Sequence, residues 1–322
     1  MQIGLKIATE AFGPKEVVRQ AQVAERAGFD FVELSDHYHP WLESQGHSAF
    51  TWSMLGSIAT STETIGLVTG VTCPSFRYHP AIIAQAAATV ALLSDNRFTL
   101  GVGSGERLSE HIVGREFPGV HKRQRVFREA LEIIKLLWQG GYQNYDGRYL
   151  QLEDARIFDL PDQPVLMPVA SGGGQASRIA AELGDGLFAT EPKSSLVNSY
   201  SQAGGDGPRY AEVPLAWAPD EDAAAQAVLE TTRWALTGWK VMSELPNPVN
   251  FEAASATVRL EDVQGQFACG PDAQKHLAAA QQFVDAGFDH LVLMNAGPDP
   301  DGFIEFFSNE LAEPLRTMTP SS

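Results

Sequence analysis

The chain has 322 residues, of which 44% are hydrophobic and 20% charged, and its 40 acidic and 23 basic side chains give a formal charge of -17 at pH 7. This composition excludes a disordered or fibrous protein, and the acidic excess argues against nucleic acid or an anionic membrane as a partner, since both require basic patches. No apolar run approaches the roughly 18 residues of a membrane span, and the first residues do not resemble a signal peptide. Cys73 and Cys269 form no metal or redox motif, so we expect a cytoplasmic protein.

Short apolar runs alternate with amphipathic stretches along the whole chain. Strands are predicted over residues 3–8, 31–34, 65–71, 98–102, 165–169, 187–189, 212–217 and 290–294. Helices are predicted over residues 14–27, 50–60, 80–94, 123–139, 175–183, 223–236 and 303–315, and an Asp-Gly turn predicts a hairpin over residues 142–150. Eight strands separated by helices predict an α/β protein, a single-domain (β/α)8 TIM barrel over residues 1–322. Residues 237–269 do not follow the repeat, and we interpret them as an insertion before the last helix–strand unit.

Polar residues follow five of the predicted strands at their carboxyl ends. These clusters are Asp36-His37, Cys73-Pro74-Ser75, Ser104-Gly105-Glu106, Ser171-Gly172-Gly173 and Thr190-Glu191-Pro192-Lys193. In a TIM barrel the carboxyl ends of the strands form one rim, and barrel enzymes keep their active sites there. General loop polarity accounts for one such cluster but poorly for five. We therefore expect one site at this rim, taking a small-molecule substrate.

Two of these clusters offer acid/base chemistry. His37 can exchange protons near neutral pH, Asp36 beside it is a carboxylate, and Trp41 offers a flat apolar wall. Glu106 is a second acid/base candidate, although a solvated acid at a helix start accounts for it equally well. The glycines at 172–174 precede a helix and suit a phosphate, but they match neither a Walker loop nor G-x-G-x-x-G.

A metal site is the rival interpretation of the first cluster. Asp36, His37, His39 and His47 include a His-x-His pattern that binds zinc in some barrel hydrolases. Such sites need further ligands from later strands, and the fourth and fifth strands end in Ser-Gly-Glu and Ser-Gly-Gly-Gly. We therefore expect no metal.

Four motifs in this order closely resemble the luciferase-like superfamily. They are Ser35-Asp36-His37-Tyr38-His39-Pro40-Trp41, Phe76-Arg77-Tyr78-His79-Pro80-Ala81, Gly101-Val102-Gly103-Ser104-Gly105-Glu106 and Ala170-Ser171-Gly172-Gly173-Gly174. Within the superfamily, the chain is most similar to the deazaflavin (F420)-dependent branch that includes the glucose-6-phosphate dehydrogenases. The match runs from Ile3 to Leu315 and weakens between about Thr190 and Ala268. The resemblance implies a (β/α)8 barrel, a cofactor at its carboxyl end and a homodimer.

The resemblance also implies roles for individual residues. It makes His37 the proton-transfer residue, Glu106 the second acid/base and Trp41 a wall of the pocket. It assigns cofactor contacts to Asp36, Gly70, Val71, Cys73, Ser104, Gly105, Ser109, Gly172 and Gly173, the last two at the cofactor phosphate, and a cis peptide bond to Gly70–Val71. The implied reaction is hydride transfer between C5 of coenzyme F420 and an alcohol or carbonyl. An FMN-dependent monooxygenase is the alternative, and a non-catalytic relative would have lost the acid/base residues, which are present.

The chain departs from this branch where the sugar-phosphate dehydrogenases hold the substrate phosphate with two lysines and an arginine. Thr190, Lys193 and, more loosely, Lys240 fall at implied substrate positions, but Gln266 falls at about the arginine position. Losing a guanidinium fork removes the best phosphate anchor, and Glu191 beside Lys193 repels a dianion. We therefore expect a neutral alcohol or carbonyl rather than a sugar phosphate. Lys193 as an ordinary surface residue remains the open alternative.

Overall fold

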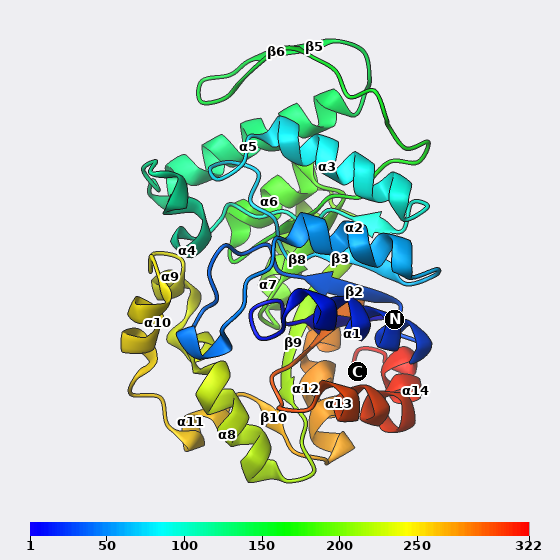
Figure 1. Ribbon diagram of the computed structural model, residues 1–322, viewed down its shortest axis with the longest axis vertical. Coiled ribbons are helices and arrows are strands. Elements are labelled where there is room, and N and C mark those ends of the chain that lie inside the picture. The colour runs from blue at the N-terminus through cyan, green and yellow to red at the C-terminus, as the bar shows by residue number, and fades with distance from the viewer. Residues whose placement is uncertain (322) are drawn as a thin grey trace.

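The structure is a computed structural model, and it describes residues 1–321. The strands are β1 (Gln2–Ile7), β2 (Phe31–Leu34), β3 (Gly66–Thr69), β4 (Phe98–Thr99), β5 (Gln143–Asp146), β6 (Gln151–Ala155), β7 (Pro168–Ala170), β8 (Gly186–Ala189), β9 (Arg209–Ala216), β10 (Ala268–Cys269) and β11 (His290–Asn295). The helices are α1 (Pro14–Arg26), α2 (Thr51–Ser61), α3 (Pro80–Leu93), α4 (Arg107–Glu110), α5 (Val120–Leu137), α6 (Gly174–Leu183), α7 (Ser194–Gln202), α8 (Glu221–Thr231), α9 (Trp239–Met242), α10 (Pro248–Ser255), α11 (Leu260–Gln264), α12 (Ala273–Asp285), α13 (Pro300–Phe306) and α14 (Ala312–Thr317). Figure 1 shows these helices arranged around a central sheet.

The central sheet is a parallel barrel. Its strands follow the order β4-β3-β2-β1-β11-β9-β8-β7, and the bridges Thr99–Leu166 and Val102–Val169 join the two ends. β10 adds a short parallel pairing to β9, and β5 and β6 form a separate antiparallel hairpin away from the barrel (Figure 1). The predicted single-domain TIM barrel is confirmed. Its apolar core fills the space between the strands and the surrounding helices.

Local sequence explains where the helices begin and end. α1 starts at Pro14, whose fixed φ suits the first helical position, and buries Val17, Ala21 and Ala24 at helical spacing. The chain leaves α1 through Gly28, which has a φ of 85°, a conformation that favours glycine. No helix in the described part of the chain is both long and apolar enough to cross a membrane.

Several predicted boundaries are wrong. No helix was predicted over α7, because its Ser- and Asn-rich sequence has weak helix propensity, yet it buries Leu196, Val197 and Tyr200 on one face. β9 begins three residues earlier than predicted, at Arg209. The expected helix over 223–236 ends at Thr231 and continues as a 3-10 turn over Arg233–Thr237. The closing helix is interrupted by a π turn over Phe307–Leu311.

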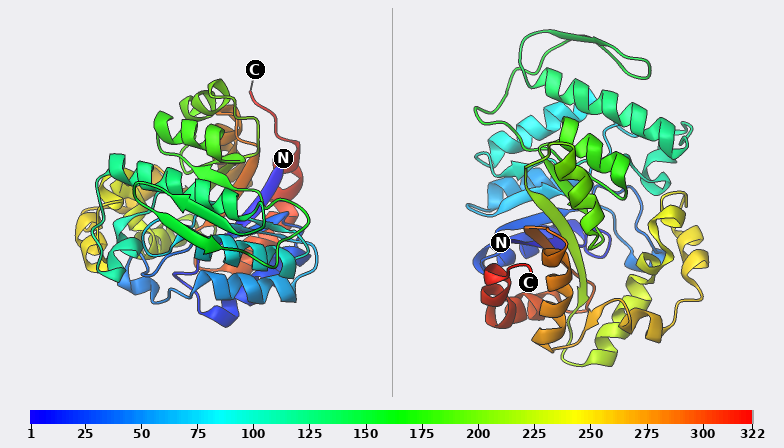
Figure 2. Two further views of the ribbon diagram at one scale, coloured as in Figure 1. Left: turned by 90° about the horizontal axis from the view of Figure 1, so that it is seen from above. Right: turned by 180° about the vertical axis from the view of Figure 1, so that it is seen from behind.

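The segment between α8 and β10 forms three short helices, α9 to α11, beside the carboxyl rim. In both Figure 1 and the rear view of Figure 2 these helices lie at one side of the barrel. Two contacts fasten the segment to neighbouring elements: Arg107 N–H donates to the Ser243 carbonyl at 3.0 Å, and Arg123 pairs with Glu244 at 2.7 Å. The segment is therefore fixed next to α4, which follows β4.

Candidate active site

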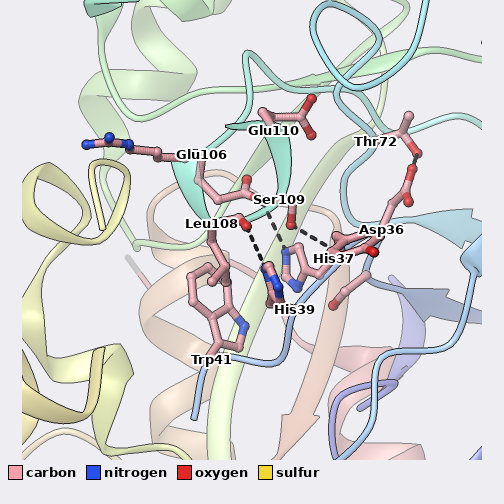
Figure 3. Close-up of polar contacts among 12 residues, drawn as sticks. Asp36, His37, His39, Trp41, Thr72, Glu106, Leu108, Ser109 and Glu110 are labelled. Atoms are coloured by element: carbon pink, nitrogen blue, oxygen red, sulfur yellow. Dashed lines mark hydrogen bonds and ion pairs between the residues drawn. The ribbon is translucent and has the colours of Figure 1, made fainter. Parts of the chain in front are cut away.

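The residues after β1, β2 and β4 meet at the carboxyl rim of the barrel. Glu10 lies after β1, Asp36 and His37 follow β2, and Glu106 precedes α4. Parallel strands place all their carboxyl ends at one edge, so these side chains converge although they are distant in the sequence. Figure 3 shows His37, Glu106 and Trp41 gathered around one point.

His37 lies between two carboxylates. Its Nδ1 is 2.5 Å from Glu10 Oε1, and its Nε2 is 4.0 Å from Glu106 Oε1. Burial alone would raise the pKa of Glu10, but the hydrogen bond and charge of His37, together with Lys6, lower it to about 2. Because Glu10 is thus ionised at neutral pH, Nδ1 is the donor in this pair, and in the neutral imidazole Nε2 keeps a free lone pair.

The same neighbours set the proton affinity of His37. Burial alone would lower the pKa of the imidazole, but the hydrogen bond and charge of Glu10 and the charge of Glu106 raise it above its usual value. The His37 side chain is 10% exposed, so it remains in reach of a bound molecule. An oriented imidazole with this exposure can accept and return a proton.

Aromatic side chains form a wall on the other side of His37. The Trp41 ring meets His37 edge-on with centroids 4.8 Å apart, and it stacks on Trp234 at 4.2 Å. Phe251 packs edge-on against Trp41, and Met242 belongs to the same buried apolar cluster. Three of these four residues, Trp234, Met242 and Phe251, come from the segment after α8. The wall beside His37 is therefore apolar.

The Asp36 carboxylate is fixed by hydrogen bonds from three neighbouring side chains. Its carboxylate accepts hydrogen bonds from Thr72 Oγ1 at 2.9 Å, from Arg77 at 2.9 Å and from Tyr78 at 3.1 Å. Arg77 also donates to the Asp36 carbonyl at 2.6 Å, and its N–H donates to Glu110 at 2.8 Å. These contacts fix the backbone that leads directly into His37.

Glu110 and Cys73 are buried next to this hydrogen-bond network. Burial raises the pKa of Glu110 to about 8, because the charge of Arg77 offsets only part of the lost hydration. Burial and the charge of Glu110 also raise the pKa of the Cys73 thiol. Cys73 packs against Gly105, whose φ of 81° and close approach to the sulfur exclude a side chain. Ser109 accepts a hydrogen bond from the Tyr38 N–H at 3.1 Å.

Backbone and small residues line the part of the rim between β3 and β4. The Gly70–Val71 peptide bond is cis, as the resemblance implied. A Cβ on Gly101 would overlap the Thr69 carbonyl, and one on Gly103 would meet Val71 Cγ2 at 2.7 Å. Glycine is therefore required at both positions for the strands to approach closely.

The glycine loop before α6 leaves donors free. Gly173 is the N-cap of α6, and no side chain caps the first N–H groups of this helix. A Cβ on Gly173 would meet no atom within 4 Å, so the space beside the loop is open. Ser171 Oγ steadies the turn by donating to the Gly173 carbonyl at 3.0 Å. Free N–H groups at a helix N-terminus are suited to an anion such as a phosphate.

The resemblance implied three substrate-binding residues, and all three lie at the surface of the chain. Thr190, Lys193 and Lys240 are all exposed. Lys193 pairs with Glu191 at 2.7 Å, which neutralises its charge, and among residues 1–321 Lys240 makes no ion pair. The structure brings together Asp36, His37, Trp41, Cys73, Gly105, Glu106 and Ser109.

Sequence reasoning missed two important residues. Glu10 was not singled out, although it stands just after the first strand, at the same edge as the other clusters. Arg77 appeared only within a motif, and nothing local to the sequence shows that it reaches Asp36. Within the described residues, no group of three or more His, Cys, Asp or Glu side chains could hold a metal ion.

Comparison with known families gives this site a context. The family model for luciferase-like monooxygenases matches residues 1–290. The chain belongs to this luciferase-like family.

Individual relatives indicate the branch of the family to which the chain is similar. The chain is 34% identical to the F420-dependent glucose-6-phosphate dehydrogenase of Tsukamurella paurometabola, covering 99% of both chains, and 34% identical to that of Microbacterium testaceum, covering 98% of both. An F420-dependent secondary alcohol dehydrogenase, solved with an F420–acetone adduct, superimposes with a TM-score of 0.91 and 28% identity over 98% of this chain and 99% of that one. The coenzyme F420-dependent tetrahydromethanopterin reductase of Methanopyrus kandleri, 20% identical with a TM-score of 0.78 over 97% of this chain and 98% of that one, shares the fold. The resemblance to the F420-dependent branch is confirmed.

Proposed function

We propose that the protein is an F420-dependent oxidoreductase that transfers a hydride between the deazaflavin and a small neutral alcohol or ketone. The observation that carries this proposal is the Glu10–His37–Glu106 arrangement, in which an oriented imidazole faces the rim with its Nε2 free. An FMN-dependent monooxygenase is the second candidate. The two classes differ in whether the reaction requires a positioned base for a hydroxyl proton.

The residues at the rim fit an anionic tricyclic cofactor. The uncapped start of α6 and the open space at Gly173 suit its phosphate, and Gly172 lies next to them. We propose that the ring system lies against the backbone at Gly70 and Val71, on which Gly101 and Gly103 pack closely. Asp36, Gly70, Val71, Cys73, Ser104, Gly105 and Ser109 are the further proposed contacts. When bound, F420 supplies a carbon centre that accepts or gives two electrons as hydride.

The protein moves the proton and excludes water. His37 Nε2 accepts the proton of the substrate hydroxyl during oxidation and returns it during reduction. Glu10 holds the imidazole in the required tautomer and stabilises its charged form. Glu106 lies 4.0 Å from Nε2, where it is placed to act as the second acid/base. Trp41 and its stacked neighbours shield the reacting atoms and align the carbinol carbon.

The substrate class follows from the wall and from the paired lysine. The side of the site formed by Trp41, Trp234 and Phe251 is apolar, which favours a substrate without charge. The segment over residues 237–269, which we propose to be an insertion in the barrel, supplies part of this wall. Lys193 is tied to Glu191 and does not offer a free cation to a phosphate.

Replacing Lys193 by Ala tests this substrate class. We expect less than a twofold change in kcat/KM for a neutral secondary alcohol, since an exposed ion pair contributes little. We also expect no turnover of glucose 6-phosphate by the wild-type protein. Steady-state rates with both substrates check the prediction. Efficient use of the sugar phosphate, lost on removing Lys193, would show that the assignment is wrong.

We also propose that two copies of the chain associate through α2 and α3. The two helices have 11 and 14 residues, pack side by side and carry no charged residue, in a chain that is 20% charged. α3 exposes Ile82 (57%), Leu92 and Leu93. Because each chain carries a formal charge of -17, two copies repel one another except where an uncharged face meets its equivalent. Figure 1 shows α2 and α3 together on one side of the barrel.

Ile82→Glu is expected to convert a homodimer into a monomer, because it places a charge on this apolar face. Light scattering after size-exclusion chromatography measures the mass of the variant and of the wild type. Glu305→Gln, an exposed site on α13, is the control. A wild-type monomer, or an Ile82→Glu dimer, would contradict the interface.

A binding experiment separates the two cofactor classes. The purified protein is titrated with F420 and with FMN, and the fluorescence of each cofactor is followed. We expect saturable binding of F420 with one molecule per chain and weaker binding of FMN. Preferential binding of FMN would favour the monooxygenase.

A further inference from the structure

A charged layer crosses the inside of the barrel directly beneath the candidate site. Along each strand, alternate residues face the interior, so Phe31 of β2 and Tyr210 of β9 form an aromatic layer, two residues before Glu33 and Glu212. Lys6 of β1 faces the same space, and ionisable residues here are unusual because barrel interiors are dominated by apolar side chains.

Lys6 connects the two carboxylates of this layer. Its ammonium group donates to Glu33 Oε1 at 2.8 Å and to Glu212 Oε1 at 2.7 Å, and it lies 3.5 Å from the Gly70 carbonyl oxygen. The Glu33 carboxyl group packs so closely under Gly70 that a Cβ there would overlap it. The charged layer therefore touches the backbone that we propose to lie beneath the cofactor.

The layer has one carboxylate more than it has cations. The Glu33 side chain has no exposed surface, and its Oε2 has no hydrogen-bond partner in the described residues. Burial and the charge of Glu212 raise the pKa of Glu33 to about 8, although Lys6 opposes this. One proton on Glu33, together with the charge of Lys6, leaves the layer neutral at pH 7.

Two further titratable groups lie in the aromatic layer: Tyr210, and His290 of β11, whose ring is 4.5 Å from that of Tyr210 and whose Nδ1 pairs with Asp289 at 2.6 Å. Lys6 and Glu212 are the ionisable neighbours of Glu33, and Glu10 acts on Lys6 from above. The facing residues of β3, β8 and β11 are Val68, Phe188 and Val292, which do not titrate.

We propose that Lys6, Glu33 and Glu212 form a positioning layer in which Glu33 holds one proton, so that the layer beneath the cofactor carries no net charge. This inference rests on the proposed function for the identity of the cofactor. Loss of the proton from Glu33 places a buried negative charge under an anionic ligand. Water screens such a charge poorly, so its ionisation weakens binding of the cofactor.

Glu33→Gln tests the layer, because Gln has the shape of a protonated Glu and cannot ionise. The dissociation constant of F420 is measured by fluorescence from about pH 6 to about pH 10, across the expected titration. Below pH 8 we expect the same affinity for both proteins. Above it, we expect the wild type to bind about tenfold more weakly than Glu33→Gln. Ionisation of F420 itself is common to both proteins and cancels in the ratio.

The proton on Glu33 is also measured without cofactor, by denaturant unfolding of both proteins across pH. Folding raises the pKa of Glu33 from 4.5 to about 8. Between these pH values the folded protein therefore keeps a proton that the unfolded chain has released. The wild type should therefore lose stability relative to Glu33→Gln as pH rises from 4.5 to 8, and the difference should then level off. Glu305→Gln, the matched exposed control, should show no such trend.

The outcomes distinguish this inference from the proposed function. The inference would be overturned if the difference in unfolding free energy between the wild type and Glu33→Gln, or the ratio of their dissociation constants for F420, did not depend on pH. Failure of both proteins to bind F420 would contradict the proposed function, and the unfolding series would still decide whether Glu33 holds a proton.

Discussion

Replacing His37 by Ala is expected to lower turnover by about 10²–10⁴-fold, the usual contribution of a positioned general base. Its imidazole is the group whose free Nε2 faces the rim, and no other side chain is held by Glu10 in its place. The affinity for F420 should change less than threefold, because the proposed cofactor contacts lie on other residues. The rate at which the alcohol reduces bound F420 checks the first expectation, and the dissociation constant of F420 checks the second.

The matched control for His37 is His121→Ala, which removes an exposed imidazole from α5. It should leave both quantities unchanged. If His37→Ala retained full turnover, another group would have to take the hydroxyl proton, and the role of His37 would be wrong. A parallel loss of cofactor affinity would instead indicate that His37 mainly binds the ring.

Glu10→Gln is expected to lower turnover by about 10²–10⁴-fold, as happens when a carboxylate that orients a catalytic imidazole becomes an amide. The amide can donate to Nδ1, which favours the tautomer with a proton on Nε2 and removes the free lone pair. Glu10 also raises the pKa of His37 by its hydrogen bond and charge, so its replacement lowers that pKa.

The pH profile gives the sign of this effect. Oxidation needs neutral His37, so kcat/KM for the alcohol falls at pH values below the His37 pKa. In Glu10→Gln this acidic limb should move to lower pH even as the maximum rate falls. Glu10→Asp, which keeps the charge, should recover part of the rate. An unmoved limb would show that Glu10 does not set the pKa of His37.

Much of the fold could be predicted because it follows from local periodicity. The alternation of apolar runs with helical stretches is enough to identify a (β/α)8 barrel. α7 was missed because its Ser-rich sequence signals a loop, and only tertiary packing of Leu196, Val197 and Tyr200 makes it a helix. The 3-10 turn after Thr231 was missed for a similar reason, since its form depends on the segment that packs against it.

The candidate site was predictable to the extent that its residues stand at strand ends. His37 and Glu106 were identified by that position, and the structure places them 4.0 Å apart. Glu10, the hydrogen-bond partner of His37, was not identified, because the sequence does not show which strand-end acid reaches the imidazole. Arg77 is a stronger example: it lies 41 residues from Asp36, and only the folded barrel brings the two together.

The aromatic wall and the charged layer were also hidden. Trp234 and Phe251 lie where the family resemblance is weakest, so no motif identified them as neighbours of Trp41. Glu33 sits within a strand that reads as apolar, and its pairing with Lys6 and Glu212 depends on closure of the barrel.

The most direct test of the central claim uses isopropanol deuterated at its carbinol carbon. With F420 and the wild-type protein, we expect loss of the visible absorbance of the deazaflavin, a slower rate than with the unlabelled alcohol, and one deuterium in the reduced cofactor by mass spectrometry. His37→Ala should carry out the same transfer far more slowly. Reduction without incorporation of deuterium would contradict hydride transfer from the alcohol to the cofactor at this site.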